Sequence, residues 1–100
     1  MIQLTARQIR RLKQLGHQLH PVIQIGKLSL TEQVQKGIDK ALDDHELIKI
    51  KINNNSEVDI QELNQLITDQ LGARIIRSIG HTILLYRPSS DENKQKISLI

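Results

Sequence analysis

The chain of 100 residues lacks cysteine, tryptophan and phenylalanine, and Tyr86 is its one aromatic side chain. Without cysteine it can form no disulfide, no thiol nucleophile and no zinc site that uses thiolate. With a single aromatic residue it has no row of rings on which splayed bases could stack, which argues against an RRM-like reader. No apolar run approaches the ~20 residues that span a bilayer, and the N-terminus lacks the apolar core of a secretory signal. We therefore expect a soluble cytoplasmic protein that does not bind membranes.

Acidic side chains are absent from residues 1–28, and this absence polarises the chain. The segment holds five basic residues and therefore has a formal charge of +5. The other 72 residues hold nine basic and eleven acidic side chains, which gives them a formal charge of −2. A molecule polarised in this way can orient itself on a phosphate backbone although its net charge is only +3. A solvated helix face gives the same pattern, so charge alone leaves both interpretations open. The five basic residues are Arg7, Arg10, Arg11, Lys13 and Lys27.

Hydrophobic periodicity predicts a helix over about residues 6–15 and a second over about 32–44. Ser29 together with Glu32, or Thr31 alone, can cap the second helix. A third helix is expected after the turn and N-cap "NNNS", and it closes at a glycine. Its predicted buried stripe consists of Ile60, Leu63, Leu66, Ile67 and Leu71, and its closing glycine is Gly72.

Four strands are expected between and after these helices. The stretch "ELIKIKI" alternates strictly, which predicts one face on the core and most of the other in water. Two later apolar strands are separated only by a short turn at Gly80 and His81, which is typical of an antiparallel hairpin. The predicted strands cover residues 22–25, 46–52, 74–79 and 82–87.

The element order is α-β-α-β-α-β-β, which predicts an α/β fold in a single domain. A strand, a helix and a second strand within about 30 residues imply a parallel pair joined by a right-handed crossover. The sheet should therefore be mixed and four-stranded, with three helices packed on it. We assign residues 1–88 to this domain and residues 89–100 to a polar tail, which we expect to be mobile or to dock weakly.

The first strand passes into the second helix through the loop Gly26, Lys27, Leu28 and Ser29. Backbone N–H groups at a helix start have no partners within the helix and attract anions. Glycine lets a ligand approach the backbone closely, and lysine adds a mobile cation. The loop therefore suits a phosphate of a nucleic-acid backbone, although glycine is also an ordinary turn residue.

The stretches "HPVIQIGK", "ALDDHELIK" and "GHTILLYRP" resemble the CRM domain, the chloroplast RNA splicing and ribosome maturation domain. The likeness extends from residue 2 to about 89 and is greatest to the bacterial single-domain YhbY-type members. It implies a fold similar to the C-terminal domain of translation initiation factor 3. It also implies an RNA-binding protein associated with precursors of the large ribosomal subunit.

The resemblance also implies site residues. The family loop is normally Gly-Lys-x-Gly, and this chain has Ser29 at the fourth position. That departure bears on any role that requires a positive φ there, and it supplies a hydroxyl that can cap the helix. The implied RNA surface consists of Arg7, Arg10, Arg11 and Lys13 of the first helix with Gly26, Lys27, Leu28 and Ser29 of the loop.

The sequence offers no catalytic residue, metal site or cofactor motif. His17 and His20 lie three residues apart but lack the carboxylate or thiolate support that a metal site needs. We therefore expect a monomeric, non-enzymatic protein that binds structured rRNA and no small-molecule substrate. Two alternatives remain: a protein-interaction module without direct RNA contact, and an RNA-modifying enzyme whose pocket the sequence does not reveal.

Overall fold

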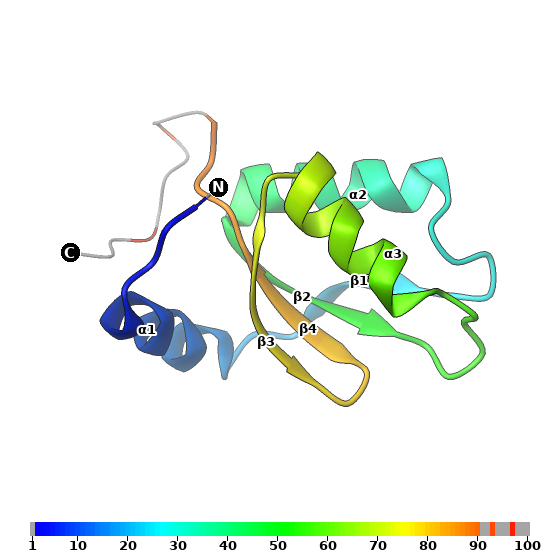
Figure 1. The fold of residues 1–100 in the computed structure, drawn as a ribbon, viewed down its shortest axis with the longest axis horizontal. Helices are drawn as coiled ribbons and strands as arrows, with labels where there is room; N and C mark the ends of the chain where they lie inside the picture. Colours follow the sequence, from blue (N-terminus) through cyan, green and yellow to red (C-terminus); the bar gives the residue numbers. More distant parts are fainter. Residues whose placement is uncertain (1, 91–92, 94–96, 98–100) are drawn as a thin grey trace.

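A computed structural model describes residues 2–90, 93 and 97, and its elements follow the predicted order (Figure 1). The helices α1, α2 and α3 alternate with β1 and β2, and the hairpin β3–β4 follows. A π-helical segment, η1, continues α3 directly. The bounds are α1 Ala6–Gly16, β1 Pro21–Ile25, α2 Glu32–His45, β2 Leu47–Ile52, α3 Ile60–Gln65, η1 Leu66–Gln70, β3 Arg74–Ile79 and β4 Thr82–Tyr86.

The strands form one mixed sheet in the order β1-β2-β4-β3. β1 and β2 are parallel and are joined through α2, whereas β4 is antiparallel to both of its neighbours. Gly80 has a φ of +56° in the turn between β3 and β4, a conformation that glycine adopts without steric cost. The predicted crossover and hairpin are both confirmed.

The helices cover the two faces of the sheet unequally. α2 and α3 lie on one face, called the inner face here, and α1 lies on the other, the outer face (Figure 1).

Ile48, Ile50 and Ile52 of β2 point into the inner core, as their alternation predicts. The expectation that most of the outer side of β2 lies in water is only partly right. Leu47 is buried under α1, Lys49 is half-buried, and only Lys51 is exposed.

The start of the third helix differs from the prediction. "NNNS" forms a turn, but Asp59 caps α3, and its Oδ1 accepts a hydrogen bond from the Gln61 N–H at 2.8 Å. Ile60 therefore occupies the first helical position and is 49% exposed, so it was wrongly placed in the buried stripe. The helix then widens, because the Leu71 N–H bonds the Leu66 carbonyl five residues back at 2.9 Å. Gly72 closes it with a φ of +63°, as expected.

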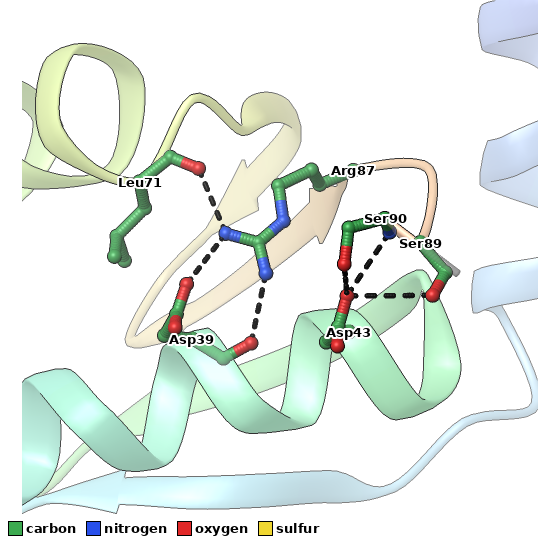
Figure 2. Close-up of polar contacts among 6 residues, drawn as sticks. All are labelled: Asp39, Asp43, Leu71, Arg87, Ser89 and Ser90. Atoms are coloured by element: carbon green, nitrogen blue, oxygen red, sulfur yellow. Dashed lines mark hydrogen bonds and ion pairs between the residues drawn. The ribbon is translucent and has the colours of Figure 1, made fainter. Parts of the chain in front are cut away.

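Arg87 ties the end of β4 to the helical layer on the inner face (Figure 2). Its Nη1 donates to Asp39 Oδ1 at 2.7 Å and to the Leu71 carbonyl at 2.9 Å, and its Nη2 donates to the Asp39 carbonyl at 2.9 Å. One guanidinium thus joins β4, α2 and the end of η1. Arg87 is a structural cation.

The chain does not leave the domain at Pro88. Ser89 is buried, and its N–H donates to Glu46 Oε2 at 2.8 Å. Ser90 donates to Asp43 through both its N–H and its hydroxyl (Figure 2). The Ile97 N–H donates to Glu46 Oε1 at 3.0 Å. Of the tail predicted to be mobile or to dock weakly, Ser89 and Ser90 are hydrogen-bonded to the domain. Apart from residues 93 and 97, the rest of the predicted tail lies outside the described residues.

Candidate nucleic-acid interface

The four basic residues of α1, called the basic row here, all lie on its solvent side. Leu12 and Gly16 are buried against the sheet, and Ile9 and Leu15 are half-buried beside them. Helical spacing then places the basic side chains on the opposite half of the helix, and all four are exposed. A capping box fixes the start of this helix, as the sequence predicts: Thr5 Oγ1 accepts from the Gln8 N–H at 3.1 Å. The basic row consists of Arg7, Arg10, Arg11 and Lys13.

Residues 26–29, called the Gly-Lys loop here, form a tight turn at the opposite end of β1 from α1. The Ser29 N–H donates to the Gly26 carbonyl at 3.0 Å, so Lys27 and Leu28 occupy the two central positions. Lys27 is exposed, and Leu28 is 82% exposed. The turn therefore projects both side chains into solvent.

Ser29 adopts a φ of +57° although it is not glycine. The left-handed backbone that a glycine favours is thus retained here at some steric cost. Of the two capping alternatives, Thr31 alone is the cap of α2, and its Oγ1 accepts from the Val34 N–H at 3.1 Å. Glu32 follows in the first turn and pairs with Lys36 at 3.1 Å. Because a hydroxyl and a carboxylate already occupy this helix start, the loop offers an anion mainly the charge of Lys27.

The structure does not bring the basic row and the Gly-Lys loop into one cluster. The outer side of β2 lies between them. Leu84, which lies against Gly16 of α1, pairs with Lys49 across the sheet. Lys51 is the next outward residue of β2 and pairs with Gln24, two residues before Gly26. The basic side chains therefore follow one another from α1 across β2 to the loop.

A groove of about 240 Å³, called the cationic groove here, lies where α1 ends on the outer face. Its polar lining comes from α1 and from three strands, and its apolar lining comes mainly from β3 and β4. The sequence interpretation omitted Lys49 and Arg77, which contribute two of its charges. The lining residues are Lys13, Gly16, His17, Lys49, Arg77, Ile79, Thr82 and Leu84.

Acidic side chains are confined to one part of the described fold. α1 and all four strands contain no aspartate or glutamate. The acidic residues between positions 2 and 90 lie on α2, within residues 57–69, and at Glu46, whose carboxylate is buried near Tyr86. All three ion pairs between described residues use carboxylates of α2. Among residues 2–90, no cation of the outer face forms an ion pair with a carboxylate, and such a surface is typical of a binding site for a polyanion.

Several side chains are excluded from this surface. Tyr86 is buried under α1, so the one aromatic ring is unavailable for stacking on a base. Burial raises the pKa of Tyr86, and the nearby Glu46 carboxylate raises it further. His17 lines the cationic groove, whereas His20 lies beside Leu19 and Val22.

Within the described residues no three potential ligands gather into a metal site, and no helix has the length and apolar character to cross a membrane.

The sequence and the fold match a known family of domains. The family model of the CRS1/YhbY (CRM) domain matches residues 4–87. The "RNA-binding protein" of Haemophilus influenzae is 38% identical over 95 residues, covering 95% of this chain and 96% of its own. YqeI of Bacillus subtilis, named a probable RNA-binding protein, is 36% identical over 92% of this chain and 95% of its own.

A solved structure supports the same family assignment. The solution structure of SAV1595 from Staphylococcus aureus superposes with a TM-score of 0.71 at 32% identity, over 96% of this chain and 100% of that one. The chain therefore belongs to the CRS1/YhbY (CRM) domain family, as the three sequence stretches predict. The Haemophilus influenzae and Bacillus subtilis relatives, which are covered over 96% and 95% of their lengths, are bacterial.

Proposed function

We propose that this chain binds structured RNA through the basic row of α1 and the Gly-Lys loop. It acts as a cytoplasmic monomer, it is not an enzyme, and its RNA is the rRNA of a precursor of the large ribosomal subunit. The observation that carries the proposal is the distribution of charge, since α1 and the four strands contain no acidic residue and the one carboxylate near the outer core, that of Glu46, is buried.

The residues of this surface have different roles in the proposal. Arg7 and Arg11 project at i and i+4 from α1, so two guanidinium groups can reach successive phosphates. Lys27 adds a flexible cation at the far end of the surface, and Gly26 keeps the backbone beside it open to close approach. Because no exposed aromatic ring is present among the described residues, phosphates, 2′-hydroxyls and RNA shape carry the recognition.

The relatives support an RNA partner through their names. The Haemophilus influenzae protein is named an RNA-binding protein, and the Bacillus subtilis protein is named a probable one. This chain covers 96% and 95% of these two relatives.

Two double variants that remove the same charge test the surface. Arg7→Gln with Arg11→Gln removes two cations from α1, and Lys36→Gln with Lys40→Gln removes two from α2 at the same i, i+4 spacing. We expect the first pair to weaken binding to a fragment of large-subunit rRNA by about tenfold or more in a filter-binding titration. The second pair should change it by less than about twofold. Equal weakening by the two pairs would reject the proposed surface.

The assignment to large-subunit rRNA requires a separate experiment. Crosslinking in cells, followed by sequencing of the bound RNA, should recover fragments concentrated in a few segments of large-subunit rRNA. The tagged protein should also sediment with precursors of the large subunit and leave the mature particle. Reads spread over messenger RNAs would overturn the ribosomal role and leave RNA binding intact.

The alternative is a protein-interaction module. It is favoured by a mostly apolar hollow of about 480 Å³ beside the end of α1, where Leu19 is 37% exposed and Val22 is 51% exposed. The loss of a co-purifying protein in a Val22→Asp variant, with RNA binding unchanged and weak, would favour this module.

A further inference from the structure

The cationic groove differs from the rest of the outer face because it combines charge with a recessed apolar surface. Lys49 and Arg77 contribute charge from β2 and β3, and Leu84 and Ile79 contribute apolar surface. Ile79 is 56% exposed, an unusual position for a large aliphatic side chain in the middle of a cationic surface.

The depth of the groove depends on how closely α1 approaches the sheet. A Cβ atom on Gly16 would lie 2.5 Å from Leu84 Cδ2, so a larger residue would force Leu84 or the last turn of α1 to shift. The helix ends there, and the sheet beyond it is left uncovered. The end of α1 thus forms one wall, and the outer side of β4 forms the floor.

A bulge in β3 supplies the opposite charged wall. The register of β3 against β4 shifts between Ile75 and Arg77. Ile76 packs under α1 on the outer face, so regular alternation would turn Arg77 inward. The bulge instead pairs Arg77 with Leu84 and places it in the groove. The bulge thereby adds a guanidinium to the wall of the groove opposite α1.

This combination fits one part of an RNA better than another. A phosphate alone would use the cations and leave Ile79 in water, whereas Leu84 is buried beneath the end of α1. The bases of a paired helix keep their faces stacked and cannot reach a recess. An unpaired nucleotide has both an apolar base face and a phosphate, and bulges and loops present such nucleotides.

We propose that the cationic groove accommodates one unpaired nucleotide of the bound RNA, with its base on the exposed side chain of Ile79 and its phosphate between Lys49 and Arg77. The hydroxyl of Thr82, at the edge of the groove, can donate to or accept from the edge of the base. This inference rests on the proposed RNA-binding function and adds that the chain selects for RNA with an unpaired residue beside a helix.

The test compares two hairpin RNAs that differ by a single bulged nucleotide. The bulged hairpin is made in four versions, one with each base, because the groove itself does not fix which base is preferred. Wild-type protein should bind at least one bulged version about fivefold or more tightly than the fully paired hairpin, because the base buries apolar surface. Affinities are measured by fluorescence anisotropy at one salt concentration.

Matched variants identify the groove as the cause. Lys49→Gln with Arg77→Gln should abolish the preference, so that both hairpins bind with similar affinity. Lys51→Gln is the control, because Lys51 lies on the same side of β2 two residues further on and does not line the groove. It should weaken both hairpins alike and keep the preference. Circular dichroism confirms that each variant is folded.

Each outcome bears on a different statement. Equal binding of paired and bulged hairpins by the wild type would overturn the nucleotide site and leave RNA binding standing. The same conclusion follows if Lys51→Gln abolishes the preference as completely as the groove variants do. Failure of the wild type to bind any of these RNAs, or the rRNA fragment, would instead overturn the proposed function.

Discussion

Replacing Arg87 with methionine should destabilise the fold and leave the RNA surface intact. The guanidinium donates three hydrogen bonds of 2.7 to 2.9 Å to α2 and to the end of η1, and its side chain is only 18% exposed. Methionine keeps most of the alkyl length, so the change isolates the loss of the charged head.

The magnitude follows from the environment of each partner. A hydrogen bond to a charged group contributes about 1.5–3 kcal/mol when its partner is withdrawn from water. The Asp39 carboxylate is 58% exposed and regains water, so its ion pair adds no more than about 1 kcal/mol. The backbone carbonyls of Leu71 and Asp39 account for the rest. We expect a loss of about 2–4 kcal/mol, a large share of the 5–15 kcal/mol typical of a small domain.

Urea denaturation followed by circular dichroism measures this loss. In thermal melts, at about 4–8 °C per kcal/mol, the melting temperature should fall by roughly 8–32 °C. Lys40→Met is the control, because Lys40 also pairs with a carboxylate of α2, at 3.2 Å, but its side chain is 78% exposed. It should cost about 0.5 kcal/mol or less. The reasoning fails if Arg87→Met costs no more than Lys40→Met.

Three further predictions follow from local geometry. Ser29→Gly should raise the free energy of unfolding by up to about 1 kcal/mol in urea, because it relieves a φ of +57°, and an unchanged or lower value would contradict the argument. Ile50→Asp should abolish the cooperative melting transition by burying a carboxylate, whereas Lys51→Asp should keep it; equal melting temperatures would refute the orientation of β2. Since burial and Glu46 raise the pKa of Tyr86, stability should fall as pH rises from about 10 through the folded-state pKa, because the unfolded chain loses that proton first. Tyr86→Phe should remove this part of the alkaline loss, and parallel stability curves for the two proteins would contradict it.

Regular periodicity explains why most of the fold is predictable from the sequence. The alternation of "LIKIKI" assigns Ile48, Ile50 and Ile52 to one face without reference to any partner. The start of α3 is less predictable, because three asparagines, Ser56 and Asp59 are all acceptable caps. Only the packed position of Leu63 selects Asp59.

Residues with distant partners are the ones that sequence reasoning misplaces. Glu46 was assigned to a strand. It instead has a φ of +66° and a buried carboxylate that accepts N–H groups from Ser89 and Ile97, more than forty residues away. No local pattern predicts such a contact.

Some parts of the candidate site can likewise be predicted from the sequence, and others cannot. The basic row and the Gly-Lys loop are visible because each is contiguous in sequence. Arg77 reaches the outer face only through a bulge, and Lys49 becomes part of a groove only because α1 ends above it. A three-dimensional surface assembled from single residues of several strands leaves no contiguous signal in the sequence.

The salt dependence of RNA binding tests the central claim most directly. If the basic row and Lys27 contact phosphates, the plot of log affinity against log salt concentration should have a slope of about −3 to −4.5. Arg7→Gln with Arg11→Gln should make that slope shallower by about 1.5–2, and Lys36→Gln with Lys40→Gln should leave it unchanged. A flat plot for the wild type, or an equal change for both double variants, would contradict the account.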